Sequence, residues 1–218
     1  MTAPTHGALD HPYAPAPVVQ TGPSGLIVGM GPRGPVTIRL FRSRPTRLVA
    51  AAPPYVTWLL AYRTVSLGAY VSLLTGRPRD WEGLRNHIQA SGGTADLVPT
   101  AHGLPEAGRP YRPSLIVDDG GTFDPATPLG PWQALLTTTT VTGPAAIQHL
   151  RSADMGLIAP HGEESVIEAM RRAYFLNPGQ VRACHLLAEG EVVLAMPRRL
   201  VRIAVRPTPG EHRLLFGS

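Results

Sequence analysis

The stretch RLVAAAPPYVTWLLAYRTVSLGAYVSLL, residues 47–74, decides the fold. Its first five residues form a short apolar run that is typical of a buried strand. Pro53 and Pro54 then stand where a helix would begin, and proline is tolerated in a first helical turn. Apolar residues recur at helical spacing from Val56 to Leu67, and YVSLL (70–74) reads as a second buried strand. The stretch therefore predicts a strand–helix–strand unit.

The same alternation continues on both sides of this unit. Further strands are expected at 95–98, 114–117, 132–138 and 156–159, and helices at 80–90 and 144–151. Residues 26–28 and 36–41 predict an N-terminal hairpin whose second strand has one polar face, as at a sheet edge. A C-terminal helix pair (163–176 and 178–187) precedes a second hairpin (191–196 and 200–205). The predicted fold is α/β, with a mostly parallel sheet flanked by helices.

Length and composition set the domain organisation and the compartment. At 218 residues the chain fits one domain, which we expect to span residues 23–218 after a flexible, proline-rich tail at 1–22. No apolar run approaches the 18 or so residues of a membrane span, and the N-terminus lacks the pattern of a secretory signal. A lone cysteine, Cys184, cannot form an internal disulfide. We therefore expect a cytoplasmic protein.

The chain contains twenty arginines and no lysine, which excludes Schiff-base chemistry and an amine general base. Residues 51–58 (AAPPYVTW) occupy the strand-to-helix position of a phosphate-binding loop, yet they include no glycine and no lysine. Two prolines remove amides that would bind phosphate, and Tyr55 and Trp58 would crowd any phosphate near Thr57. No nucleotide hydrolysis is expected, and we assign no catalytic residue and no cofactor.

Three other motifs were considered as sites. GMGPRG (29–34) matches the dinucleotide-binding pattern, but a strand follows it where that pattern requires a helix. Asp118 and Asp119 end an apolar strand, where open α/β sheets place metal-binding or catalytic acids, although aspartates before Gly-Gly are also common turn residues. The eight histidines show no metal-ligand spacing, so no metal is expected.

Positive charge is concentrated in the first part of the chain. Residues 1–79 contain eight arginines and one acid, a formal charge of +7, whereas 80–218 contain twelve arginines and fourteen acids, a charge of −2. Five arginines fall within fifteen residues: Arg33, Arg39, Arg42, Arg44 and Arg47. This cluster could bind an acidic protein face, anionic lipid or nucleic acid, or it could be a solvated surface.

The order of the elements resembles the core of a RecA/P-loop ATPase with a degenerate phosphate loop. SLIVDD (114–119) is Walker-B-like, and WQALLTTTT (132–140) is similar to a sensor strand. The ending GEVVLAMPRRLVRIAVRPTPGEHRLL (190–215) resembles closing segments of hexameric translocation ATPases of the FtsK/EccC and conjugation-coupling type. The whole pattern, including PVTIRLFRSRPTRLV (35–49), resembles proteins associated with actinobacterial type VII (ESX) secretion.

This resemblance implies a pseudo-ATPase that acts through contacts. Only Asp118 and Asp119 match a functional ATPase position, as a vestigial Walker-B-like pair. The implied protein is a non-catalytic cytoplasmic component or adaptor of a type VII secretion apparatus, peripheral to the inner membrane face. Its partners would be secretion proteins, and its hairpin edge could support self-association. The alternatives are a nucleotide- or cofactor-dependent transferase using Asp118 or Asp119, and a nucleic-acid-binding protein using the Arg33–Arg47 cluster.

Overall fold

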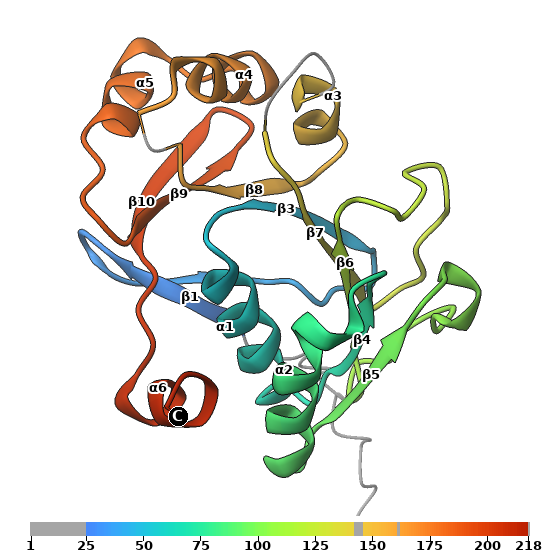
Figure 1. Cartoon of the computed structure of the whole chain (residues 1–218). Helices are drawn as coiled ribbons and strands as arrows, with labels where there is room; N and C mark the ends of the chain where they lie inside the picture. The colour runs from blue at the N-terminus through green and yellow to red at the C-terminus, as the bar shows by residue number, and fades with distance from the viewer. Residues whose placement is uncertain (1–24, 142–145, 161, 218) are drawn as a thin grey trace, which may run out of the picture.

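The computed structural model describes residues 25–141, 146–160 and 162–217, whose strands all belong to one ten-stranded sheet (Figure 1). The strands are β1 (Leu26–Gly31), β2 (Gly34–Ile38), β3 (Thr46–Ala51), β4 (Tyr70–Leu74), β5 (Thr94–Val98), β6 (Ser114–Asp119), β7 (Gln133–Thr138), β8 (Met155–Ile158), β9 (Glu191–Met196) and β10 (Arg199–Ala204). The predicted tail, residues 1–22, lies outside the described part of the chain.

Six neighbouring strands form a parallel core in the order β8-β3-β7-β6-β4-β5. The chain leaves β3 toward β4, returns through β6 and β7, and then crosses β3 to reach β8. The carboxyl end of β3 is therefore a point where the direction of strand addition reverses, which is where open α/β sheets bind ligands. The predicted α/β fold class is confirmed.

Helices cover both faces of the sheet. They are α1 (Pro54–Val65), α2 (Pro78–Ala90), α3 (Ala146–Arg151), α4 (Glu164–Tyr174), α5 (Pro178–His185) and α6 (Pro209–Leu215). Helices α1, α2 and α6 pack on one face, and α3, α4 and α5 pack on the other (Figure 1). Buried apolar side chains between these layers form two main cores, so the sheet is covered on both faces as its continuous apolar strands predict.

The two hairpins extend the parallel core into an antiparallel half. β9 pairs with β8, β10 pairs with β9, and β1 joins β10 to the edge strand β2. The sequence predicts both hairpins and the edge position of the second strand. It does not predict that the two hairpins pair with each other, because partner choice between distant strands is not encoded in either strand's own pattern.

Helix α6 was not predicted. It packs in the same layer as α1 and α2. Its N-cap, Thr208, accepts a hydrogen bond from the Glu211 amide while the Glu211 side chain bonds back to the Thr208 amide. This capping box starts a helix of only seven residues. Among the described residues, none of the helices combines the length and the apolarity needed to cross a membrane.

Candidate functional site

The carboxyl end of β3 leads directly into α1 through the segment that replaces a phosphate-binding loop. Pro53 is the helix N-cap, in an extended conformation with φ −53° and ψ 144°, and makes no side-chain cap. Pro54 has no amide hydrogen, and the Val56 amide already donates to the Pro53 carbonyl at 2.9 Å. Phosphate loops work by converging several free amides on the anion. Here prolines remove two of them.

A shallow depression of about 300 Å³ opens beside this segment, at the carboxyl ends of β3, β7 and β8. Its described lining is Ala51, Ala52, Pro53, Thr139, Thr140, Val141, Ile158, Ala159, Glu163 and Val166. The one charged side chain in that lining is the carboxylate of Glu163. A carboxylate repels phosphate, and no arginine in this lining offsets its charge.

The expectation that Tyr55 and Trp58 crowd this site is wrong. The Trp58 ring packs against Trp81 at 6.4 Å and against Phe216 at 6.2 Å, measured between ring centroids. Tyr55 packs against the same core, and neither ring belongs to the described lining of the depression. The reason is helical phase, since both rings bury apolar area in the layer of α1, α2 and α6. Missing amides and an acidic wall therefore characterise this end of β3.

Asp118 is fully buried and serves the loop that follows β6. One carboxylate oxygen accepts hydrogen bonds from the amide and the hydroxyl of Thr122, at 2.8 and 2.9 Å. The other accepts from the Phe123 amide at 3.2 Å. Gly120 and Gly121 turn the chain between them with φ values of +98° and +71°, which favour glycine. The carboxylate therefore fixes a turn, as the turn interpretation of the sequence proposes.

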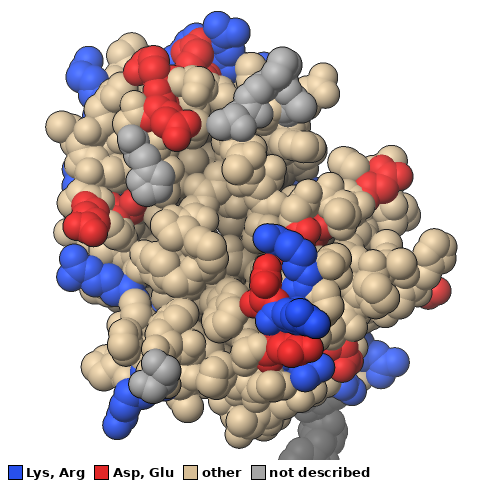
Figure 2. All heavy atoms as spheres, viewed as in Figure 1, with Lys and Arg blue, Asp and Glu red and all other residues tan. Residues whose placement is uncertain are grey.

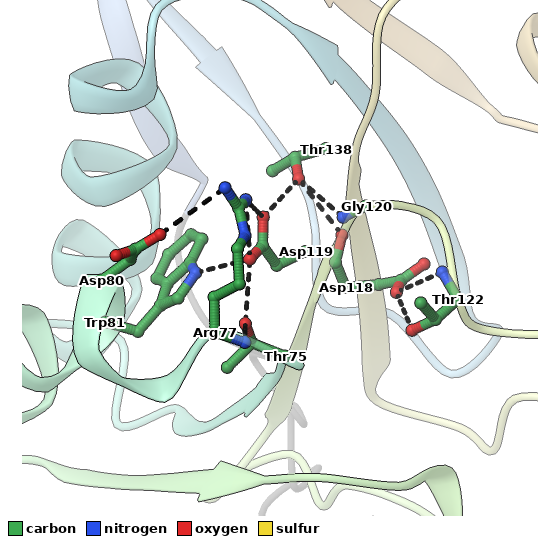
Figure 3. Close-up of polar contacts among 9 residues, drawn as sticks. All are labelled: Thr75, Arg77, Asp80, Trp81, Asp118, Asp119, Gly120, Thr122 and Thr138. Carbon is green, nitrogen blue, oxygen red and sulfur yellow. Dashed lines mark hydrogen bonds and ion pairs between the residues drawn. The ribbon is translucent and has the colours of Figure 1, made fainter.

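Asp119 points to the opposite face and is the centre of a polar cluster (Figure 3). Its carboxylate accepts hydrogen bonds from the Trp81 indole at 2.9 Å, from the Thr75 hydroxyl at 2.9 Å and from the Arg77 guanidinium at 2.9 and 3.0 Å. Burial would raise the pKa of Asp119, but the hydrogen bonds from Trp81, Thr75 and Arg77 lower it below the ordinary value. The carboxylate is thus ionised and bound to groups of β4 and α2.

The threonine run that ends β7 contacts both the aspartate pair and the depression beside Pro53. The Thr138 hydroxyl accepts a hydrogen bond from the Gly120 amide at 3.2 Å and lies 3.4 Å from an Asp119 oxygen (Figure 3). Thr139 and Thr140 line the depression beside Pro53. The sensor position of the resembled ATPases therefore contacts the Walker-B-like pair, as strand order requires. All four carboxylate oxygens of Asp118 and Asp119 accept hydrogen bonds from protein groups.

Sequence reasoning missed the partners of Asp119. Thr75 and Arg77 follow β4 directly, and Trp81 lies in the first turns of α2. The signal was available, because β4 and β6 are adjacent parallel strands whose carboxyl ends lie at the same edge of the sheet. The segment TGRPRDW (75–81) therefore lies at the same edge of the sheet as the aspartates.

The structure divides the predicted arginine cluster. Arg33, Arg39 and Arg44 are exposed. The Arg42 guanidinium bonds to the Thr46 hydroxyl at 2.9 Å and lies 3.5 Å from the Asp154 carboxylate. Arg47 donates to the Thr127 carbonyl at 2.8 Å, and its guanidinium lies 5.9 Å from the centre of the Phe123 ring. On the face drawn in Figure 2, arginines and acids are interleaved rather than separated into one basic field.

A metal site and a cysteine nucleophile find little support in the described residues. They contain no group of three or more histidine, cysteine or acidic side chains that could hold a metal. Cys184 is buried, and burial raises the pKa of its thiol to about 11. At neutral pH it is therefore a neutral thiol, and a neutral thiol is a poor nucleophile.

Comparisons with known proteins identify the fold. No protein-family model and no curated protein matches the sequence. VirB4 of Thermoanaerobacter pseudethanolicus superposes with a TM-score of 0.53 and 10% identity, covering 86% of this chain and 98% of VirB4. The genome packaging NTPase B204 of Sulfolobus turreted icosahedral virus 2, solved with AMP, gives 0.53 and 8%, covering 78% of this chain and 100% of B204. The protein thus has the α/β fold of P-loop ATPases, with a mostly parallel sheet and flanking helices.

Proposed function

We propose that the protein is a non-catalytic, pseudo-ATPase-like component or adaptor of a protein secretion apparatus. The protein shares its fold with VirB4, and this supports the comparison with the ATPases of secretion systems. The assignment to type VII secretion in actinobacteria comes from the sequence resemblance of the whole pattern, including residues 35–49. In this proposal the protein works in the cytoplasm by contacting other proteins, and the ATPase-like sheet is its scaffold.

The proposal that the protein is non-catalytic rests on two places in the structure, the Pro53–Pro54 segment and the Walker-B-like pair. Pro53 and Pro54 stand where amides would hold phosphate, and the one charged side chain in the described lining beside them is that of Glu163. Asp119, one of the Walker-B-like pair, is bound to Trp81 and Arg77. Freeing Asp119 for a metal would leave the buried Trp81 indole without its acceptor.

Nucleotide binding is the competing expectation for this fold, since B204 was solved with AMP. We expect isothermal titration of the full chain with ATP and Mg²⁺ to give no heat of binding, because the amides and the lysine that grip a triphosphate are missing. B204 titrated in the same buffer is the positive control. Micromolar binding with turnover that is abolished by Asp119→Ala would refute the proposal.

Partner contacts are proposed to use the exposed arginines Arg33, Arg39 and Arg44, which face an acidic protein surface or the inner membrane face. We expect replacement of all three by serine to reduce the recovery of a secretion-locus protein, captured by the wild-type chain, at least tenfold. A tenfold loss of affinity corresponds to about 1.4 kcal/mol of binding free energy. The matched control replaces Arg79, Arg199 and Arg213, which are also exposed. Equal loss in both triple variants would show that net charge alone matters.

A further inference from the structure

A second cavity lies at the opposite, amino-terminal edge of the parallel strands. It has a volume of about 440 Å³ and, like the depression beside Pro53, it is open to solvent. Its described lining is Tyr70, Pro105, Ala107, Arg109, Tyr111, Arg112 and Ser114. Tyr70 begins β4 and Ser114 begins β6, while the other lining residues belong to the loop between β5 and β6. No residue of the Pro53 or Asp119 region takes part.

Two arginines of this cavity are held side by side by the backbone. The Arg109 amide donates to the Arg112 carbonyl at 3.0 Å, and the Arg112 amide donates to the Arg109 carbonyl at 3.0 Å. Residues opposed in this way on an antiparallel bridge direct their side chains to the same face. Neither guanidinium forms an ion pair with a described acid. Like charges placed opposite each other cost stability, and an anion between them would remove that cost.

Aromatic rings stand beside the two cations. The Arg112 guanidinium carbon lies 6.0 Å from the centre of the Tyr70 ring, and Arg109 donates to the Tyr111 hydroxyl at 3.3 Å. Tyr111 is 76% exposed, the most exposed large apolar side chain among the described residues. Asp96 accepts a hydrogen bond from the Tyr70 hydroxyl, and Glu106 lies in the chain between two lining residues, but neither acid forms an ion pair with Arg109 or Arg112. The wall thus offers flat apolar surface next to positive charge.

A buried hydroxyl without a partner also belongs to the lining. Ser114 is 2% exposed, and its Oγ makes no hydrogen bond to any described group. A buried hydroxyl that lacks a partner costs free energy, so such groups are normally satisfied by protein, water or ligand. The Ser114 Oγ is closed to solvent, so the evidence for an anionic ligand is the arginine pair.

We propose that this cavity binds an anionic group carried on an aromatic body, with the anion between Arg109 and Arg112 and the ring against Tyr70 and Tyr111. Guanidinium pairs bind carboxylates and phosphates through the same parallel N–H donors. The ligand is therefore an aromatic phosphate monoester or an aromatic carboxylate. This proposal does not depend on the proposed secretion role, because the cavity lies at the other edge of the sheet.

The test titrates the full chain with phenyl phosphate, 3-phenylpropionate and inorganic phosphate, followed by ¹H–¹⁵N chemical shifts. We expect saturable binding of at least one aromatic anion with a Kd of about 1 mM or below, with shifts centred on residues 105–114. Whichever of the two binds more tightly identifies the anion as phosphate or carboxylate. Inorganic phosphate should bind at least about tenfold more weakly, since it lacks the ring that stacks on tyrosine.

Two variants and one control locate the site. Arg109→Gln and Arg112→Gln should each weaken binding by at least about tenfold, because each removes a charge-assisted contact. Arg79→Gln removes an equally exposed arginine on α2 and should leave the Kd unchanged. Because the replaced side chains are exposed, an otherwise unchanged spectrum will verify folding. No saturable binding of either aromatic anion, equal binding of inorganic phosphate, or full affinity in both variants would overturn the proposal.

Discussion

Replacing Arg63 by alanine is expected to lower the free energy of unfolding by about 3 kcal/mol, the low end of the range for breaking a buried ion pair. Arg63 lies on α1 and binds the Glu211 carboxylate of α6 through two nitrogens, at 2.7 and 2.9 Å. The same guanidinium donates to the carbonyls of Val28 and Arg206, at 2.9 and 2.8 Å. The substitution therefore leaves the carboxylate with the Thr208 amide as its remaining described donor and removes the guanidinium from two carbonyls, which urea unfolding would detect.

The loss should depend on pH in one direction. Burial would raise the pKa of Glu211, yet Arg63 and the Thr208 amide lower it below the ordinary value. A depressed pKa in the folded state means that the stabilisation is complete above the unfolded pKa, at about 4.3, and disappears as the pH falls through the folded value. The difference between wild type and Arg63→Ala should thus shrink below that pH.

Arg171→Ala is the matched control for this prediction. Arg171 also forms a two-nitrogen pair with a glutamate, Glu168, at 2.6 and 2.7 Å. The side chains of Arg171 and Glu168 on α4 are 47% and 35% exposed, whereas those of Arg63 and Glu211 are 12% and 13% exposed. Exposed pairs contribute little to stability, so the control should unfold like the wild type. Equal losses in the two variants would contradict the importance we give to burial.

The sequence predicts the parallel half of the fold well because its signals are local. Most strands from 47 to 159 are mainly apolar runs, and the helices between them have apolar faces, so these signals do not depend on distant information. The observed strands β3, β4, β6, β7 and β8 all overlap the predicted ranges. The pairing of β10 with β1 and the position of α6 were not predictable, since they depend on contacts between the two ends of the chain.

The candidate site shows the same division. Asp118 and Asp119 were found because acids at the carboxyl ends of buried strands are recognisable in one segment. Their opposite uses were not predictable in detail, because adjacent residues of a strand face opposite sides and each side has its own partners. Trp58 was misassigned for a related reason: its core partners, Trp81 of α2 and Phe216 just after α6, come from distant parts of the chain.

Replacing Asp118 by alanine is expected to lower the free energy of unfolding by about 3 kcal/mol, from the loss of hydrogen bonds to a buried charge. The amides of Thr122 and Phe123 and the Thr122 hydroxyl would lose their acceptor in a site that is closed to water. An acid held for catalysis behaves differently, because active-site residues are commonly strained and their removal often stabilises the fold. The sign of the change in urea unfolding therefore separates a structural Asp118 from a catalytic one.

Asp124→Ala provides the comparison within the same loop. Asp124 is exposed, and its carboxylate accepts one described hydrogen bond, from the Ala126 amide at 2.8 Å. Its removal should cost much less than that of Asp118, because water can replace the lost acceptor at an exposed amide. An Asp118→Ala protein that is as stable as the wild type would mean that this carboxylate is not needed to hold the turn. The transferase alternative, in which Asp118 is a working acid, would then regain its best residue.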